Sequence, residues 1–416
     1  MHIRIFTSPR RSIQPRCAKP HSQQDVTTAS FTKPFFTNQC SIKQRGRARQ
    51  FVIGGLALAS LQSTFALIPK AEAFTAFETP TDSLLISGRI AYDYQWNRSG
   101  TTDDRFGNGG TRLNVAYQHK LSNGWILTGR WEEALDPLYT THSGDAHFNR
   151  QRFVGVTFPE YGTLSFGRQN SLLYDFVDVY TDQPYFYGDY SEMSWSGSDL
   201  NGSVMRPSST LKYVVTKGKW TLGAMYGWSR GTLHDHDITG ADGEPQRIQY
   251  GSKRKDFVEV GAKFKPSHDV TLSAVYHYAH IKSLENNASY PTPNANAWDL
   301  GASWTPGNWY LAAVGGRSRN VVAHNAVNNH YGTYAQYTFP AVWGDGNDLL
   351  VYGLYDLRTD QRSAANKDRR VIGTAARLFH RQFIVALEHV WNKDKNSQGD
   401  HIYHHDSTVL LARYNF

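Results

Sequence analysis

Short segments in which apolar and polar residues alternate follow one another along most of this chain. In "LLISGRIAYDYQWN" (84–97), the even-numbered positions include Ile90, and the odd-numbered positions include Arg89 and Asp93. The same period recurs in "RLNVAYQHK" (112–120). Side chains on one face of a β-strand repeat every two residues, so each segment predicts a strand with one apolar and one polar face.

The number and length of these segments indicate a membrane barrel. About sixteen of them follow the first 73 residues, and each has roughly ten residues, the length with which a tilted strand crosses a bilayer. A soluble β-sandwich is the alternative, but it does not need aromatic residues at its strand ends. Here Trp96, Trp228 and Tyr414 fall near segment ends, where membrane barrels have their interfacial aromatic residues. We predict an all-β fold, a transmembrane antiparallel β-barrel of about 16 strands, closed around an aqueous lumen.

The distribution of charge excludes one class of partner. The 416 residues have a formal net charge of +8, which favours nucleic acid or an anionic surface when the charge lies in the folded part. However, residues 1–73 hold eleven Lys/Arg and two Asp/Glu, which leaves a net charge of −1 for the rest of the chain. We therefore predict no nucleic-acid partner.

The first 73 residues have the organisation of an export signal. A basic stretch (43–50) precedes an apolar run (51–68), and the small-x-small site Ala71–Ala73 follows. This order is typical of a cleaved signal peptide. We expect residues 1–73 to be a leader, with its signal peptide at about 43–73, and residues 74–416 to form the mature barrel.

Three further observations concern the leader: its length, a possible membrane anchor and its cysteines. Residues 1–42 exceed the usual length of a charged signal region, which indicates an over-extended translation start. An uncleaved membrane anchor is the alternative, although Gln62 and Ser63 interrupt the apolar run. Cys17 and Cys40 are the two cysteines of the chain and both lie in the leader, so the mature chain has neither a disulfide nor a thiolate metal site.

One long connection breaks the alternation. Short links such as 121–124 alternate with longer polar ones such as 230–254 and 281–295, as expected of periplasmic turns and extracellular loops. The connection at about 171–206 differs, because its stretch "YTDQPYFYGDYSEMSW" (180–195) is aromatic and acidic. A loop that only faced water would not need so many aromatic side chains, so we expect it to fold into the lumen and narrow the channel.

Several motifs together carry a resemblance to a known family. They are, in order, "GR" in the first strand, "TRLNV", "GRWE", "RQRFVGV", "YGTLSFGRQNSLLYD", "YTDQPYFYGD" and a terminal "ARYNF". In this order the chain after residue 80 resembles the enterobacterial trimeric general porins of Gram-negative bacteria. The resemblance implies a 16-stranded barrel in the outer membrane whose third loop folds inward opposite a ladder of wall arginines. It implies a homotrimer, surrounded by outer-membrane lipid, that lets small hydrophilic solutes and ions diffuse and that meets the assembly machinery through Phe416.

The resemblance also implies which residues line the constriction. The wall arginines that match the family pattern are Arg89, Arg112, Arg152 and Arg206. Glu132 beside them and Asp182 on the loop also match it. The alternation adds two pairs, because Arg130 with Glu132 and Arg150 with Arg152 are each two residues apart and are expected to share a face. The alternative is that these charges are ordinary solvated lumen residues. The predicted constriction residues are Arg89, Arg112, Arg130, Glu132, Arg150, Arg152, Asp182, Tyr185, Tyr187, Asp189 and Arg206.

The loop departs from the family pattern in one place. The stretch "PYFYGD" of this chain is similar to the motif Pro-Glu-Phe-Gly-Gly-Asp of the general porins. In this comparison Tyr185 replaces a carboxylate and Tyr187 replaces a glycine. The acidic side of the constriction is therefore weaker and more aromatic. Aromatic rings pack loops against walls and also bind the apolar faces of sugars. We expect packing for most of them, and a saccharide-preferring porin remains an alternative, while cation or anion preference stays open.

No other pattern predicts chemistry. The histidine-rich stretches 234–237 and 401–406 lie near loops and lack the spacing of a metal site. We predict no cofactor and no metal. A barrel hydrolase is a second class of function, but sixteen strands and a long inward loop favour passage over catalysis, so we predict that the chain is not an enzyme.

Overall fold

The wall strands make up most of the part of the chain that the structure describes. The computed structural model describes residues 74–96, 105–137, 147–187, 205–228, 236–239, 245–248, 252–283, 294–320, 327–360, 366–395, 401–403 and 406–416. The predicted leader lies outside these residues. Among the described residues, no helix is both long and apolar enough to cross a membrane.

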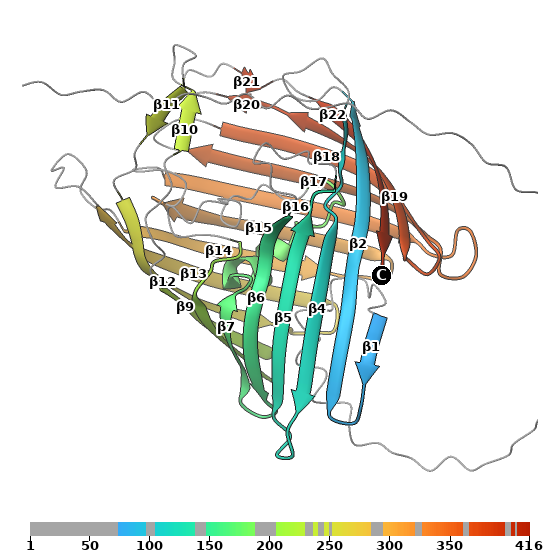
Figure 1. Ribbon diagram of the computed structural model, residues 1–416. Coiled ribbons are helices and arrows are strands. Elements are labelled where there is room, and N and C mark those ends of the chain that lie inside the picture. The colour runs from blue at the N-terminus through green and yellow to red at the C-terminus, as the bar shows by residue number, and fades with distance from the viewer. Residues whose placement is uncertain are drawn as a thin grey trace, which may run out of the picture. The chain divides into compact units, whose positions relative to one another are not determined.

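Sixteen strands form the wall when β3 and β4 are counted as one interrupted strand (Figure 1). Consecutive strands pair antiparallel, as predicted. The wall strands are β2 (Asp82–Trp96), β3 (Arg105–Asn108), β4 (Arg112–Lys120), β5 (Ile126–Leu135), β6 (His147–Phe158), β7 (Gly162–Arg168), β8 (Thr210–Lys217), β9 (Trp220–Trp228), β12 (Ser252–Phe264), β13 (Val270–Ser283), β14 (Ala295–Trp304), β15 (Trp309–Arg319), β16 (Val327–Phe339), β17 (Asp348–Asp360), β18 (Asn366–Leu378), β19 (Phe383–Asn392) and β22 (Ser407–Asn415).

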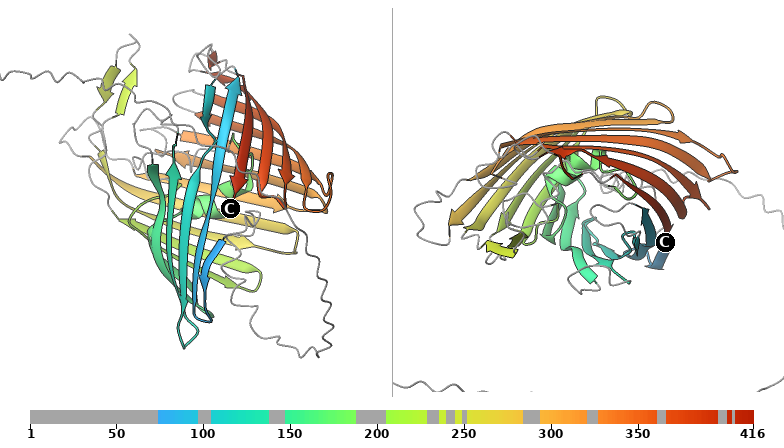
Figure 2. Two further views of the ribbon diagram at one scale, coloured as in Figure 1. Left: turned by 45° about the vertical axis from the view of Figure 1, so that its right-hand side comes forward. Right: turned by 90° about the horizontal axis from the view of Figure 1, so that it is seen from above.

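The two ends of the described chain close the barrel together on β2. Strand β22 pairs with the second half of β2, where Asn415 lies opposite Arg89. Strand β1 (Phe74–Glu78) pairs with the first half, where Phe74 lies opposite Ile86. Figure 2 shows the C-terminus beside β2 in the turned view. Closure satisfies the backbone groups of what would otherwise be free sheet edges, which lipid requires.

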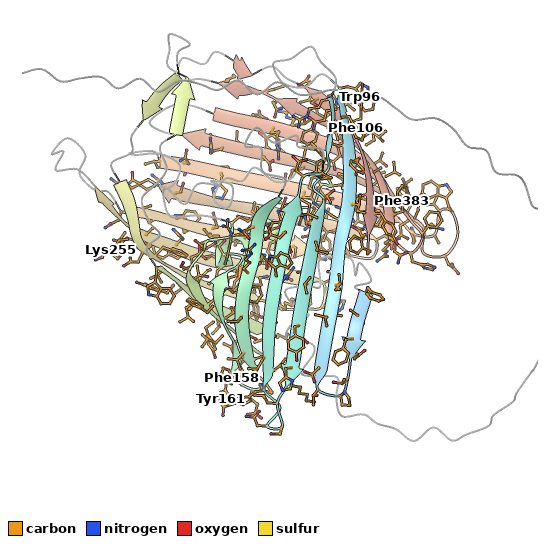
Figure 3. The ribbon with its side chains drawn as sticks, viewed as in Figure 1. Trp96, Phe106, Phe158, Tyr161, Lys255 and Phe383 are labelled. Carbon is orange, nitrogen blue, oxygen red and sulfur yellow. The ribbon has the colours of Figure 1, made fainter. Side chains whose placement is uncertain are left out.

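The two faces of the wall differ as the alternation predicts. On β12, Val258 is 41% exposed while its neighbour Glu259 is 1% exposed. Exposed large apolar residues recur on the same outer face of the other strands. Aromatic side chains gather near the strand ends: Figure 3 shows Trp96 and Phe106 near one end and Phe158 and Tyr161 near the other. This arrangement is that of a lipid-facing belt between two interfaces.

The connections distinguish the two ends of the barrel. At one end the strands are joined by short turns, such as those between β4 and β5 and between β6 and β7. At the other end the connections are long, and one contains a short hairpin, β10 (His236–Thr239) with β11 (Pro245–Ile248), which the sequence did not indicate. Two further short strands, β20 (Asp394–Lys395) and β21 (His401–Tyr403), lie in the connection before β22. Short turns mark the periplasmic end of such barrels, and long loops mark the extracellular end.

Candidate pore constriction

The first two wall arginines face each other across neighbouring strands. Arg89 on β2 lies directly opposite Arg112 on β4. The break between β3 and β4 holds Gly110, which has φ +90°, and the Nε of Arg89 donates to the Gly110 carbonyl at 2.7 Å. Glycine adopts this left-handed conformation without steric cost. The interrupted strand therefore gives the Arg89 guanidinium a backbone acceptor in place of a carboxylate.

Glu132 on β5 is a buried carboxylate of this side of the wall that bonds two arginines. Its Oε2 accepts from Arg130 at 2.9 Å and its Oε1 from Arg150 at 2.5 Å. Arg130 also donates through Nε to Asn114 on β4 at 2.8 Å. Paired, charge-assisted hydrogen bonds hold the guanidinium groups in fixed orientations. The predicted pairing of Arg130 with Glu132 is therefore present in the structure.

The remaining arginines of this side lie close to one another. Arg112 interacts electrostatically with Arg150, Arg206 and Glu132, and Arg89 interacts with Arg112, Arg150 and Glu132. Arg206, predicted as a wall arginine, lies instead in the connection before β8, over the ring of Tyr174 at 5.7 Å. Like charges at this density repel one another, and they create a local positive potential.

The prediction that Arg150 and Arg152 share a face is wrong. Glu132 pairs with Gln151 and Glu133 pairs with Asn149, so a β-bulge falls at Arg150 and reverses the alternation. A bulge adds one residue to a strand and thereby changes which face the next side chain takes. Arg152 lies opposite Trp131, contacts its ring at 5.9 Å, bonds Glu133 and is 51% exposed. It therefore belongs to the outer face.

The long connection begins with a short helix against the wall. Helix α2 (Leu172–Phe176) is capped by Ser171, whose Oγ accepts from the N–H of Tyr174 at 3.1 Å, a common way to satisfy a free N-terminal N–H. The helix contacts β9, β12 and β13. The Leu172 N–H donates to Glu259 Oε2 at 2.6 Å. Because Glu259 points away from the exposed belt, α2 lies on the inner, polar face of the wall.

Small wall residues make room for this packing. A Cβ added to Gly223 on β9 would lie 2.7 Å from Leu172, and one added to Gly301 on β14 would lie 2.8 Å from Tyr180. Both distances are too short for non-bonded atoms, so glycine permits the close approach. Leu172, Phe176 and Tyr180 are almost fully buried. Tyr180 belongs to the 3₁₀ turn η1 (Asp178–Tyr180), which contacts β14 and β15.

Two lysines of the wall hold the middle of the helix. Lys212 on β8 bonds Asp175 at 2.8 Å, and Lys263 on β12 lies over the ring of Phe176 at 4.8 Å. Burial opposes ionisation of Asp175, but the contacts with Lys212 outweigh it and hold the pKa of this carboxyl below its usual value. The contact between helix α2 and the wall therefore includes an ion pair in which Lys212 compensates the buried charge of Asp175. A buried charge without a partner would be strongly destabilising.

Asp182 and Arg206 share a neighbour, Tyr174. The Oδ2 of Asp182 accepts from the hydroxyl of Tyr174 at 2.9 Å. Burial raises the pKa of Tyr174, so this phenol stays protonated and donates. Asp182 also interacts electrostatically with Arg206. The predicted neighbour Asp189 lies outside the described residues.

Glu388 on β19 holds the end of the described segment, and sequence reasoning did not single it out. Its carboxylate accepts from the N–H groups of Tyr185 at 2.6 Å, of Phe186 at 3.1 Å and of Tyr187 at 2.8 Å. The hydroxyl of Tyr352 donates to the same carboxylate at 2.6 Å. A carboxylate that accepts four hydrogen bonds is a strong anchor. The only signal in the sequence was a carboxylate at a lumen-facing position.

Tyr185, which replaces the expected loop carboxylate, packs between two wall residues. Its ring lies 6.1 Å from that of Tyr352, and the Arg413 guanidinium lies 4.7 Å above it. The cation over the ring face is attracted by the π system. In this position Tyr185 serves loop packing, which agrees with the use we expected for most of these rings.

Comparison with known proteins identifies the family. The model of the Gram-negative porin family matches residues 55–381, so the chain belongs to this family. Outer membrane porin F of Salmonella typhimurium is 23% identical over 278 residues, which cover 62% of this chain and 68% of that protein. Outer membrane porin N of Escherichia coli is 24% identical over 263 residues, which cover 58% and 67%.

Solved structures share the fold. OmpF of Salmonella typhi aligns with a TM-score of 0.61 and 16% identity, over 82% of this chain and 99% of that chain. The anion-selective porin from Comamonas acidovorans aligns with a TM-score of 0.57 and 15% identity, over 80% and 100%. OmpT of Vibrio cholerae in its trimer form aligns with a TM-score of 0.55 and 16% identity, over 81% and 100%.

Family membership and the closed barrel establish the function in outline. The chain is a multi-pass β-barrel of the Gram-negative outer membrane and a pore for passive diffusion of small hydrophilic solutes and ions. Proteins of this family are channels, so the chain is not an enzyme. The predicted 16-stranded antiparallel barrel and the predicted outer-membrane diffusion pore are confirmed.

Proposed function

We propose that the wall arginines and the segment 171–187 form the constriction of this pore. The observation that carries the proposal is the position of Tyr174, whose hydroxyl donates to Asp182 and whose ring lies under Arg206. Tyr174 also interacts electrostatically with Arg112 of the wall. A fixed field in a narrow, low-dielectric passage orients dipolar solutes and selects ions. The proposed wall residues are Arg89, Arg112, Arg130, Glu132 and Arg150, and the proposed residues of the long connection are Asp182, Tyr185, Tyr187, Asp189 and Arg206.

Replacing Arg112 or Arg206 with alanine tests this proposal. One unit charge at about 4 Å contributes about 1 kcal/mol in water, which converts to up to about a fivefold change in the anion-to-cation permeability ratio. We expect the reversal potential of purified protein in planar bilayers to move toward cation preference. The outer-face arginine gives a matched control, because Arg152→Ala removes the same charge from a side chain that contacts Trp131 instead of the lumen. Equal shifts for all three variants would contradict the proposal.

We also propose that the chain acts as a homotrimer in outer-membrane lipid and reaches the assembly machinery through Phe416. The trimer form of a structural neighbour supports the oligomer. Phe416 ends the chain next to β22, where its N–H and carbonyl bond Gly88 on β2 at 3.1 and 2.7 Å.

Deleting Phe416 tests the assembly signal. We expect folded barrel in the outer membrane to fall several-fold, measured by heat-modifiable mobility on gels. Phe416→Tyr keeps a terminal aromatic residue and is expected to assemble at parental levels. Unchanged levels after the deletion would argue against the signal.

A further inference from the structure

Two arginines of the inner face lie outside the set assigned to the constriction. Arg377 on β18 and Arg413 on β22 both lie opposite Ile384 of β19, so they share one row of the sheet with a single strand between them. Two strand spacings separate their backbones by about 10 Å. Ala375, two residues from Arg377, and Leu411, two residues from Arg413, are buried on the inner face. Both arginine side chains therefore belong to the lumen.

These two arginines continue the arginines of β2 and β4 around the barrel. Arg413 lies opposite Ala91, two residues from Arg89, so the two arginines are diagonal neighbours on adjacent strands. Arg89 interacts electrostatically with Arg413, and Arg413 interacts in the same way with Arg377. Arg89 and Arg377 are partly exposed. A solute in the lumen can therefore reach their guanidinium groups.

The described carboxylates near this row are bonded to other groups. Asp348 lies opposite Arg377 in the sheet, but its Oδ2 accepts from Arg381 at 3.0 Å. Glu388 interacts with Arg413, but it already accepts four hydrogen bonds. Among the described residues, the buried Nε atoms of Arg377 and Arg413 have no hydrogen-bond partner. A buried donor without an acceptor costs free energy, which an anionic ligand would recover.

The position of Arg413 suits such a ligand. Its guanidinium lies 4.7 Å from the centre of the Tyr185 ring, and a guanidinium stacked on a ring keeps its N–H donors in its own plane. Arg413 is only 9% exposed, so water and salt screen its charge weakly. Planar pairs of N–H donors match the paired oxygens of carboxylates and of tetrahedral oxyanions.

We propose that Arg377 and Arg413, with Arg89 beside them, bind a divalent oxyanion inside the pore. A second negative charge doubles the attraction to each guanidinium, so the site favours divalent over monovalent anions. The row lies four residues nearer the short-turn end of β19 than Glu388, between the end of the held segment and the periplasmic mouth. The proposal adds a class of ion to the proposed function and rests on it only through Arg89 and Tyr185.

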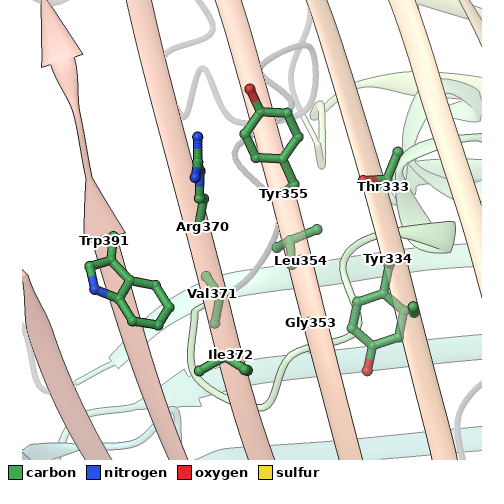
Figure 4. A pocket seen from close by; sticks show the side chains of 10 residues that line it. Thr333, Tyr334, Gly353, Leu354, Tyr355, Arg370, Val371, Ile372 and Trp391 are labelled. Carbon is green, nitrogen blue, oxygen red and sulfur yellow. The ribbon is translucent and has the colours of Figure 1, made fainter.

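Inhibition of the single-channel chloride current by sulfate tests the proposal, with purified full-length protein in planar bilayers at constant ionic strength. Arg377→Gln is expected to weaken inhibition about tenfold, as the loss of a hydrogen bond to a charged group does. Arg370→Gln is the matched control. Arg370 lies on the same strand, but its exposed guanidinium stands 5.4 Å over the ring of Tyr355 (Figure 4). This variant is expected to be inhibited as the parent is.

Two further anions separate a binding site from a general positive potential. Methanesulfonate presents sulfonate oxygens with a single charge, and it is expected to inhibit only at about tenfold higher concentration than sulfate. Malonate carries two carboxylates. Stronger inhibition by malonate than by sulfate identifies a dicarboxylate as the preferred solute, and the reverse identifies a tetrahedral oxyanion. Equal inhibition by methanesulfonate and sulfate would overturn the proposal.

A conservative variant tests the donor geometry. Arg413→Lys keeps the charge but loses the planar donor set, so its inhibition is expected to lie between those of the parent and of Arg377→Gln. Heat-modifiable mobility on gels shows that each variant is folded. Parental inhibition of folded Arg377→Gln, or an equal loss in Arg370→Gln, would contradict the site. A parental reversal potential in Arg206→Ala together with weakened sulfate inhibition in Arg377→Gln would refute the constriction and leave the anion site standing.

Discussion

The inner face of the barrel has two sides that are built differently. Strands β9 and β12 to β15 present glycines and buried, hydrogen-bonded carboxylates, and the segment 171–180 packs on them. Strands β2 to β6 present arginines, and Glu132 on β5 bonds two of them. The side on which the segment packs, called the covered side, provides room for it and hydrogen-bond acceptors for its backbone. The other side provides arginine side chains. The comparison shows that one side holds the segment, and the proposed constriction assigns the other side to selection among passing ions.

The covered side itself uses two kinds of contact. The start of the segment is held by apolar burial of Leu172, Phe176 and Tyr180. Its end is held by the Glu388 carboxylate, which accepts three successive backbone N–H groups. Apolar burial depends on area and shape, whereas the hydrogen bonds to Glu388 depend on direction. The three predictions below separate these contributions.

The largest effect is expected from Phe176→Ala. Truncating a buried phenylalanine leaves a cavity and costs about 3–5 kcal/mol. We expect this loss in the free energy of unfolding, measured by urea titration of the barrel in lipid vesicles. Phe166→Ala is the control, because Phe166 is 52% exposed on the outer face and its loss is expected to cost less. Equal losses would show that Phe176 is not part of a packed anchor.

A smaller effect is expected from Glu388→Ala. Removing the carboxylate leaves the N–H groups of 185–187 without their acceptor, which costs about 2–3 kcal/mol locally. We expect a noisier single-channel current and a higher mean conductance, because the end of the segment is released while Phe176 still holds its start. Glu160→Ala in the exposed β6–β7 turn serves as the control. A quiet current at parental conductance would mean that Glu388 does not restrain the passage.

The smallest effect on stability is expected from the double variant Tyr185→Gly/Tyr187→Gly. The lost aromatic contacts with Tyr352 and Arg413 cost about 1 kcal/mol, so the barrel stays folded. We expect liposomes with this variant to swell faster in large sugars, because less volume borders the passage. Tyr161→Gly, at an exposed turn, is the control. Faster swelling in all sugars by the same factor would indicate a general opening, and slower swelling in a particular sugar would favour the saccharide-preferring alternative.

Most of the fold was predictable from the chain itself. The alternation predicted the strands and their faces: Ile90 is exposed and Asp93 is buried, on opposite faces of β2 as expected. It also placed Arg89 and Arg112 on polar faces, and their direct pairing followed from the antiparallel order. These features depend on a two-residue period and on lipid outside the barrel, and both act strand by strand.

The site was only partly predictable. The bulge at Arg150 places Arg152 on the outer face. One extra residue in a strand moves every later side chain to the opposite face relative to the partner strand. Glu388 was missed because it lies about two hundred residues from Tyr185 in the chain. No local pattern distinguishes a carboxylate that accepts backbone N–H groups from one that faces water.

The sequence by itself determined a closed, lipid-facing barrel with an aromatic, non-alternating connection, because local periodicity decides which face of each strand tolerates hydrocarbon. Only the tertiary structure decided which lumen charges meet. Closing the barrel brings β19 and β22 to the end of the segment that begins at β7, and there Glu388 and Arg413 contact Tyr185. Contacts between distant strands depend on register and on bulges, and these are set by the pairing of the whole sheet rather than by any one segment.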